Sequence, residues 1–174
     1  MFEIVSKQST ASWKHIAVME GVDFYDRSDE DTSIRQGMSV GVVPNSTPLV
    51  ILSVLVGAFR DHNHPFVKNK SNVREVIEDL NDHSSIIHLV SRLPSRMTHR
   101  ESIQTYIWRG MSPGVYIFVQ RSVVDNRVPP RPGFVRAYVK FFAYLLRPAP
   151  DGSNSTLETM IASADPRGMI PASI

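Results

Sequence analysis

The sequence predicts an α+β fold built on one largely antiparallel β-sheet with few helices. Eight segments carry the β-branched and aromatic residues of strands, and most are separated by stretches rich in Gly, Pro, Asn, Asp and Ser. A single apolar segment with the start signals of a helix interrupts them. Consecutive strands with one main helical interruption indicate antiparallel pairing rather than a parallel sheet with alternating helices.

The first predicted strands form a hairpin. Residues 14–25 read as one strand that ends in the charged turn DRSDED, and the segment TSIRQGMSVGVV then resumes an extended pattern. A helix is predicted next, because Thr47 can cap its start and Pro48 fits its first turn. Its apolar run, Leu49–Phe59, is too short for a membrane span, since a helix needs about 20 residues to cross a bilayer.

Six further strands are predicted after the helix. They cover Asn72–Leu80, Ser84–Leu93, Glu101–Trp108, Val115–Val124, Phe134–Leu146 and Thr156–Ala164. The strand at Phe134–Leu146 has one wholly apolar face, and its other face alternates aromatic residues with Arg136 and Lys140. Two interpretations are open: the mixed face is solvated around partly covered rings, or it lines a cavity in which the rings bind an apolar body and a cation meets a polar head.

Composition narrows the function classes. The chain has 174 residues, which suits one domain with a substantial core. A formal charge of +2 is too small to supply the phosphate contacts of a nucleic-acid binder, so we expect no nucleic-acid partner. The absence of cysteine excludes disulfides and cysteine nucleophiles and suits a reducing compartment. With no signal-type apolar stretch in the first ten residues, the predicted location is the cytoplasm.

The sequence contains one apparent nucleophile motif. Gly37–Gly41 matches G-x-S-x-G, in which the serine sits on a sharp turn between a strand and a helix. Here the extended pattern continues after Ser39 and no helix begins there. A serine hydrolase that uses Ser39 is the alternative, but we interpret the match as coincidental, with three small residues on one strand face that leave room for a ligand.

The clusters of metal-ligating or acidic residues are also weak evidence for a metal site or a catalytic site. Asp61, His62 and His64 could ligate a metal, but neighbouring residues of one loop make a poor cage, and a surface loop is the preferred interpretation. The acidic residues near the end of one predicted strand read as solvated turn residues rather than catalytic carboxylates; they are Glu78, Asp79 and Asp82. The sequence therefore predicts no catalytic residue, no metal site, no cofactor and no enzyme.

The C-terminal part of the chain carries the most specific pattern. Residues 133–174 are similar to the G-[VF]-[IV]-R-A strand of the START domain and to its D-x-x-G-x-[IL]-P close, here at Asp165, Gly168, Ile170 and Pro171. Upstream, Arg100-Glu101-Ser102 stands where the family usually has Arg-Asp-Phe. The resemblance extends from about Trp13 to the end of the sequence, and it identifies the chain as similar to the lipid-transfer modules related to the steroidogenic acute regulatory protein.

This resemblance implies a helix-grip fold, in which a curved antiparallel sheet folds around a long C-terminal helix and encloses a hydrophobic tunnel. The implied START-like domain covers residues 13–174, after an N-terminal segment at residues 1–12. Because the sequence ends at Ile174, just after the proline that introduces the family's long helix, we expect a domain truncated before that helix. Asp125–Pro132 stands where a loop that opens for the ligand is expected.

The resemblance also implies a function. Such domains bind a lipid or another hydrophobic molecule in an internal cavity without altering it, for lipid transfer or sensing, and contact membranes peripherally and transiently. The alternative is a START-like interaction or regulatory module of a larger multidomain signalling protein, with little lipid transfer of its own. In both cases the implied partner chemistry is apolar, because transfer of apolar surface out of water drives binding.

Candidate ligand-binding residues follow from the same resemblance. The aromatic cage that binds choline in some members is replaced by Leu89, Ser102 and Lys140, and the acid–arginine pair of sterol binders is absent. The residues expected to face the cavity are Leu89, Gln104, Tyr106, Trp108, Arg136, Tyr138, Lys140 and Phe142. A cation such as Lys140 or Arg136 beside the aromatic rings would suit an anionic or hydroxylated head, with a structural ion pair of Arg136 as the alternative.

Overall fold

The computed structural model describes residues 13–28, 34–61, 63–65, 72–94 and 97–168. Within these ranges the chain forms ten strands and one helix. In order they are β1 (Lys14–Met19), β2 (Val22–Ser28), β3 (Arg35–Val43), α2 (Pro48–Arg60), β4 (Val73–Asn81), β5 (Ser84–Ser91), β6 (His99–Ser112), β7 (Val115–Ser122), β8 (Phe134–Arg136), β9 (Tyr138–Pro148) and β10 (Thr156–Asp165).

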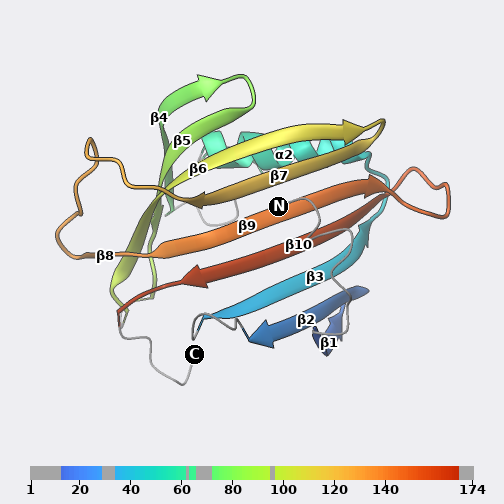
Figure 1. Ribbon diagram of the computed structural model, residues 1–174, viewed down its shortest axis with the longest axis horizontal. Helices are drawn as coiled ribbons and strands as arrows, with labels where there is room; N and C mark the ends of the chain where they lie inside the picture. The colour runs from blue at the N-terminus through green and yellow to red at the C-terminus, as the bar shows by residue number, and fades with distance from the viewer. Residues whose placement is uncertain (1–12, 29–33, 62, 66–71, 95–96, 169–174) are drawn as a thin grey trace.

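The ten strands make one curved sheet (Figure 1). Their spatial order is β1-β2-β3-β10-β9-β7-β6-β5-β4, and the short β8 lies beside β6. Neighbours pair antiparallel throughout, except that β8 and β6 are parallel. The predicted α+β class and antiparallel sheet are therefore confirmed. Because β10 lies between β3 and β9, the last strand joins the N-terminal strands to the rest of the sheet.

The N-terminal strand prediction was wrong in one detail. Residues 14–25 form two strands, β1 and β2, rather than one. The chain reverses at Glu20 and Gly21, which have φ angles of 51° and 79°. Two consecutive residues with positive φ are typical of the tight turns that match the twist of a hairpin. β2 then pairs with β3 as well, so the predicted hairpin is a three-stranded meander.

Helix α2 begins where the sequence predicts. Pro48 occupies its first turn, and Thr47 precedes it with the extended backbone of an N-cap residue. The helix ends at Arg60, and the backbone N–H of Asp61 still donates to the carbonyl oxygen of Gly57. Within the described part of the chain, no helix has the length and apolar character needed to cross a membrane.

The predicted strand at Phe134–Leu146 is also two strands. The ladder is interrupted at Ala137, whose backbone N–H donates to the carbonyl oxygen of Glu101 at 2.9 Å. β8 pairs with β6, whereas β9 pairs with β7 and β10. Within β9, Val139 lies opposite Ala164 and Phe141 lies opposite Ser163, so Lys140 is the extra residue of a bulge. The expectation of one strand with two regular faces is therefore wrong.

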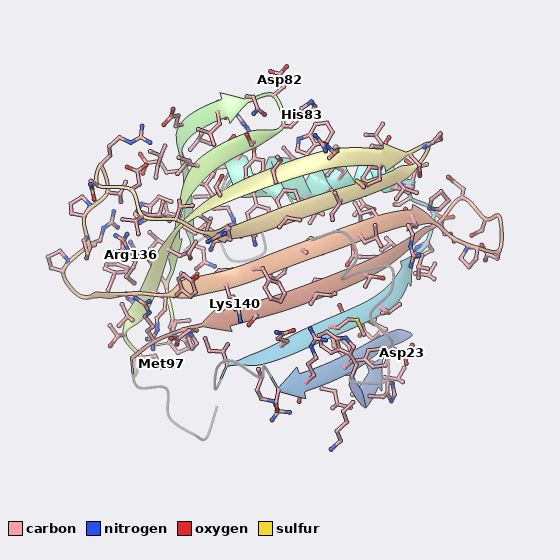
Figure 2. All side chains as sticks on the ribbon, in the orientation of Figure 1. Asp23, Asp82, His83, Met97, Arg136 and Lys140 are labelled. Carbon is pink, nitrogen blue, oxygen red and sulfur yellow. The ribbon has the colours of Figure 1, made fainter. Side chains whose placement is uncertain are left out.

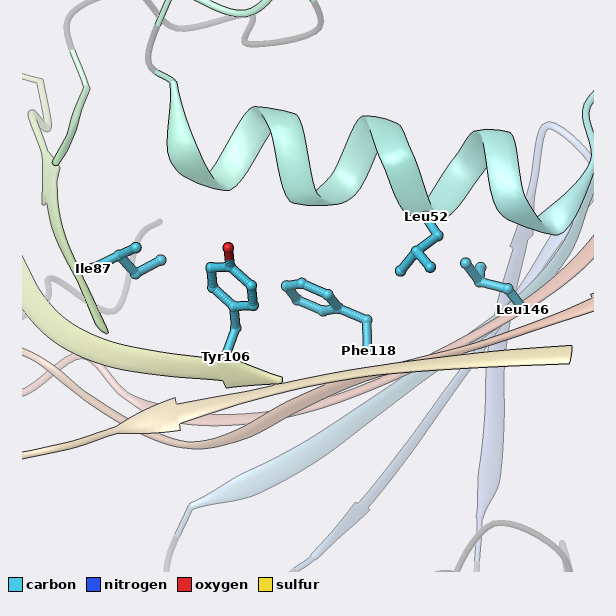
Figure 3. Close-up of a cluster of buried hydrophobic side chains, with 5 residues drawn as sticks. All are labelled: Leu52, Ile87, Tyr106, Phe118 and Leu146. Atoms are coloured by element: carbon cyan, nitrogen blue, oxygen red, sulfur yellow. The ribbon is translucent and has the colours of Figure 1, made fainter. Parts of the chain in front are cut away.

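The core lies between α2 and one face of the sheet, called the inner face below; the opposite face is the outer face. Five side chains that are at most 2% exposed form its centre (Figure 3). They are Leu52, Ile87, Tyr106, Phe118 and Leu146. The Phe118 ring stacks on Phe59 of the helix and on Tyr106 of β6, at 5.3 Å between centroids in both cases. Aromatic burial of this kind fixes the helix on the sheet.

In the second half of β9, alternate side chains lie on the inner and outer faces. Tyr144 packs against the core cluster, whereas Ala143 and Leu145 lie on the outer face beside Ile117. Burial, followed by the proximity of Glu158, raises the pKa of Tyr144 to about 12. At Tyr144 the mixed face of this strand is therefore packed against the core rather than solvated.

Candidate ligand-binding face

Strand register brings many of the predicted site residues onto the inner face. Tyr106 lies opposite Gln120, which in turn lies opposite Phe142. Leu89 lies opposite Ser102 on the neighbouring pair of strands. Residues that are directly opposite in antiparallel strands share a face. The structure thereby brings together five of the eight predicted residues: Leu89, Gln104, Tyr106, Trp108 and Phe142.

The middle of the inner face is aromatic. Trp108 lies opposite Phe118, and its ring contacts the His83 ring edge-on at 4.2 Å. Phe142 lies 5.2 Å from Tyr144, ring centroid to ring centroid. These rings offer a large apolar area next to the core, which is the surface that an apolar molecule would contact.

A polar region adjoins these rings on β6 and β7. Gln104 and Gln120 are 4% and 5% exposed, and the Nε2 of Gln104 donates to the Oγ of Ser102 at 2.7 Å. The Oε1 atoms of both glutamines are buried, and neither has a hydrogen-bond partner in the described part of the chain. Buried polar atoms normally have a partner, so this pair is an exception that needs a cause.

Arg74 adds a cation to the same face. It lies on β4 opposite Leu89, which places it on the same transverse row as Ser102. Its Nε and Nη1 atoms are buried and, among the described residues, have no hydrogen-bond partner. Burial lowers the pKa of the Arg74 guanidinium.

Sequence reasoning missed both Arg74 and Gln120. The sequence held one signal for Arg74. Side chains alternate between the two faces of a strand, so in the segment V-R-E-V Arg74 lies on the same face as Val76, a residue that packs against the core. Alternation alone did not say which parity of this strand faces inward.

Arg60 ties the end of α2 to the sheet beside the polar region. Its Nη1 donates to the hydroxyls of Tyr106 and Ser85, at 3.2 and 3.0 Å, and to Oδ1 of Asp79 at 2.6 Å. Hydrogen bonds from Arg60 and then from Ser85 lower the pKa of Asp79 to about 2. Asp79 is thus an ion-pair partner rather than simply a solvated turn residue, and Tyr106 is held by its hydroxyl.

Arg136 lies apart from the inner face. Its Nη2 is 3.0 Å from Oε1 of Glu101, whose side chain is fully buried, and His88 Nε2 is 2.9 Å from the other oxygen, Oε2. Glu101 precedes Ser102 on β6 and therefore faces the opposite side of the sheet. The structural ion pair that the sequence left open is present.

The other two predicted residues do not join the inner cluster by strand alternation. Tyr138 begins β9, where the guanidinium of Arg167 lies 5.6 Å from its ring centroid. Lys140 lies farther along β9, at the bulge, whereas Arg136 is close to the loop before β8 (Figure 2). Ligand contact by Arg136, Tyr138 and Lys140 stays a prediction.

The two family-like motifs, at Arg100–Ser102 and Asp165–Pro171, contact each other although they are far apart in the sequence. Arg100 donates from Nε to the carbonyl oxygen of Pro166 at 3.2 Å and from Nη2 to that of Arg167 at 2.8 Å. Gly168 has a φ of 66°, and a side chain there would meet Val135 at 3.3 Å. The last two positions of this motif, Ile170 and Pro171, lie outside the described residues, as does the predicted N-terminal segment at residues 1–12.

Two hollows are lined mainly by residues outside the inner face. One of about 580 Å³ separates the loop Asp125–Pro132 from the outer side of β4, β5 and β6, with His88 and Glu101 among its lining residues. The backbone N–H of Arg131 donates to Oε1 of Glu101 at 2.9 Å, so this loop is tied to the buried carboxylate. The other hollow, of about 10 Å³, lies against the outer face of β7, β9 and β10.

The weak chemical motifs have structural explanations. Ser39 lies in the middle of β3, which pairs on both sides with β2 and β10, so there is no sharp turn at the serine. This supports the coincidental interpretation of G-x-S-x-G. Within the part of the chain that the structure describes, no group of three His, Cys, Asp or Glu side chains is arranged to hold a metal. His62 lies outside the described residues.

Comparison with solved structures supports the fold. Human STARD10 aligns with a TM-score of 0.79 and 22% identity over 98% of this chain and 67% of that chain. Human StAR-related lipid transfer protein 5 aligns with a TM-score of 0.78 and 19% identity over 99% and 81%. The lipid transfer and protein localization domain of human StarD13 (DLC2) aligns with a TM-score of 0.77 and 21% identity over 98% and 86%.

Comparison at the sequence level gives the family. A search of the curated proteins found no match. The family model of the START domain matches residues 60–174, which is about two thirds of the chain. The helix-grip fold expected from the resemblance agrees with this match and with the solved structures. The chain therefore belongs to the START domain family, which is known for lipid binding and transfer.

Proposed function

We propose that this chain binds one lipid or other hydrophobic molecule against its inner face, without altering it chemically, and that it serves lipid transfer or sensing. The observation that carries this proposal is the aromatic inner face of a START domain, where Tyr106 and Trp108 of β6 share one face of the sheet with Phe142 of β9, and β7 lies between the two strands. Removal of apolar surface from water supplies the binding free energy, at about 25 cal/mol per Å².

The proposed partners follow from the same chemistry. The chain contacts membranes peripherally and transiently while it loads or releases its ligand, and the loop Asp125–Pro132 moves during that step. A formal charge of +2 argues against nucleic acid as a partner, and the lack of cysteine favours the cytoplasm.

Native mass spectrometry after incubation with a total lipid extract tests the proposal. We expect one bound lipid per chain. Substituting Trp108→Ala removes aromatic contact area from the inner face and is expected to weaken binding about tenfold, which corresponds to roughly 1.4 kcal/mol.

The matched control is Ile107→Ala, the adjacent residue on β6, which is 52% exposed and faces outward. This variant should bind lipid like the unmodified chain. An empty unmodified protein, or equal binding by both variants, would argue against the proposal.

A further inference from the structure

The polar region of the inner face combines three kinds of hydrogen-bonding group at one end of the aromatic surface. Arg74 has buried N–H donors without a partner, and Gln104 and Gln120 have buried acceptors without a partner, all within the described residues. Each glutamine is at least 95% buried, so bulk water does not satisfy these atoms. A buried polar group without a partner destabilises the folded protein, and an unpaired buried charge does so more strongly.

Strand register places these groups on the same face of β4, β6 and β7. Arg74, Leu89 and Ser102 lie side by side across β4, β5 and β6. Gln104 is the next inward residue on β6, and Gln120 is its diagonal neighbour on β7. Adjacent strands are about 4.8 Å apart, so a long arginine side chain spans much of the distance across β5.

The chemistry of the groups specifies what would satisfy them. A guanidinium offers N–H donors in a planar fork that fits a carboxylate or phosphate, and its charge needs a negative partner when it is buried. A carboxamide oxygen accepts a hydrogen bond and therefore needs a donor such as a hydroxyl. An oxyanion alone would leave the glutamine oxygens without a donor, and a hydroxyl alone would leave the charge of the arginine without a negative partner.

We propose that Arg74, Gln104 and Gln120 bind the polar head of the ligand, and that this ligand is an apolar molecule carrying an oxyanion together with a neighbouring hydroxyl. Arg74 pairs with the oxyanion, and the hydroxyl donates its single O–H to one of the two glutamine oxygens. The apolar body then lies along Trp108 and Phe142. This inference rests on the proposed function and names the ligand class of the same face.

The assignment differs from the sequence-based expectation for the head group. Arg136, one of the two cations expected there, forms an ion pair with Glu101 on the other side of the sheet. Arg74 instead has no such carboxylate in the described part of the chain, and its burial lowers the pKa of its guanidinium. An arginine with buried N–H groups and no carboxylate partner is stabilised when a ligand brings an anionic group to it.

Three lipids with one acyl chain each separate the interaction of the oxyanion with Arg74 from that of the hydroxyl with the glutamines. 1-Oleoyl lysophosphatidate carries both a phosphate and a hydroxyl, 1-oleoylglycerol carries hydroxyls without an anion, and oleate carries a carboxylate without a hydroxyl. Their affinities are measured by isothermal titration below their critical micelle concentrations. The unmodified chain should bind the lysophosphatidate most tightly. Tighter binding of oleate or of 1-oleoylglycerol than of the lysophosphatidate would overturn the inference.

Substitutions then assign each interaction to its residue. Arg74→Met should weaken binding of the lysophosphatidate and of oleate about tenfold or more and leave 1-oleoylglycerol unchanged. The double substitution of Gln104→Leu and Gln120→Leu should weaken both hydroxyl-bearing probes severalfold and leave oleate unchanged. The control Arg109→Met removes an exposed arginine of β6 and should change none of the three affinities.

The ligand-free protein gives an independent readout. Because Arg74 lacks a carboxylate partner among the described residues, Arg74→Met should leave the thermal midpoint unchanged or raise it. A large fall would assign Arg74 a structural role and overturn the inference.

The remaining outcomes separate the two proposals. Equal binding of all three probes by the unmodified chain and by Arg74→Met would overturn the inference and leave the proposed function standing. Binding of none of the three, with no lipid captured from the extract, would overturn both.

Discussion

Replacing Phe118 with alanine should lower the free energy of unfolding by about 3–5 kcal/mol, a large part of the stability of a domain this size. Phe118 is 0% exposed and lies at the centre of the core cluster. Its ring stacks between Phe59 of α2 and Tyr106 of β6. Its removal therefore leaves a cavity between the helix and the sheet, and neither neighbouring ring can fill that cavity without losing its present contacts.

Urea denaturation followed by far-ultraviolet circular dichroism measures this loss. The matched control is Arg121→Ala, which removes an exposed side chain from the outer face of the same strand and should change the unfolding free energy by less than about 0.5 kcal/mol. A loss below about 1 kcal/mol for Phe118→Ala would contradict the packing of α2 on this ring.

The fold was predictable because its signals are local. Alternating apolar residues and turn-forming stretches mark most strands, and Pro48 marks the start of α2. One error, the missed break between β8 and β9, arose where the backbone is hydrogen-bonded to a partner far away in the sequence. Ala137 interrupts a strand pattern because its N–H donates to Glu101, which lies more than thirty residues earlier in the chain. Nothing in the local sequence around Ala137 contains that information.

The candidate site was predictable only in part, for a related reason. Residues such as Tyr106 and Trp108 follow from the family resemblance and from regular alternation along β6. Lys140 could not be assigned because a bulge breaks the alternation there, and Arg74 could not because the inward parity of β4 depends on its pairing with β5. Register is a property of strand pairs, so a single strand does not reveal it.

The largest electrostatic effect is expected at Glu101. Substituting Glu101→Gln should lower the free energy of unfolding by about 3–5 kcal/mol at neutral pH, because it leaves the charge of Arg136 without its buried partner. One carboxylate oxygen accepts from the Arg136 side chain and from the backbone of Arg131, and the other is hydrogen-bonded to His88. An amide can still accept from Arg136 and Arg131 through its oxygen while its NH2 group donates to the His88 ring, but it carries no charge to balance Arg136.

The pH dependence of the same variant follows from the direction of the Glu101 shift. Burial raises the pKa of this carboxyl, but the hydrogen bonds from Arg131, His88 and Arg136 outweigh burial, and the net pKa lies below its usual 4.5. A carboxyl with a lowered folded-state pKa stabilises the fold fully above its unfolded pKa, and that contribution is lost as the pH falls through the folded pKa. The difference in stability between the unmodified protein and Glu101→Gln should therefore be constant near neutral pH and shrink below about pH 4.5.

Urea titrations at a series of pH values test this behaviour, with Glu75→Gln as the control. Glu75 is an exposed carboxylate opposite His88 on β4, and its substitution should have little effect on stability. Glu101→Gln should also loosen the loop Asp125–Pro132, since Arg131 donates its backbone N–H to this carboxylate, and faster hydrogen exchange at Arg131 would report it. If the stability difference stays constant down to pH 3, the stabilising interactions of Glu101 do not depend on its charge, and hydrogen bonds that a neutral group also forms hold the loop on β6.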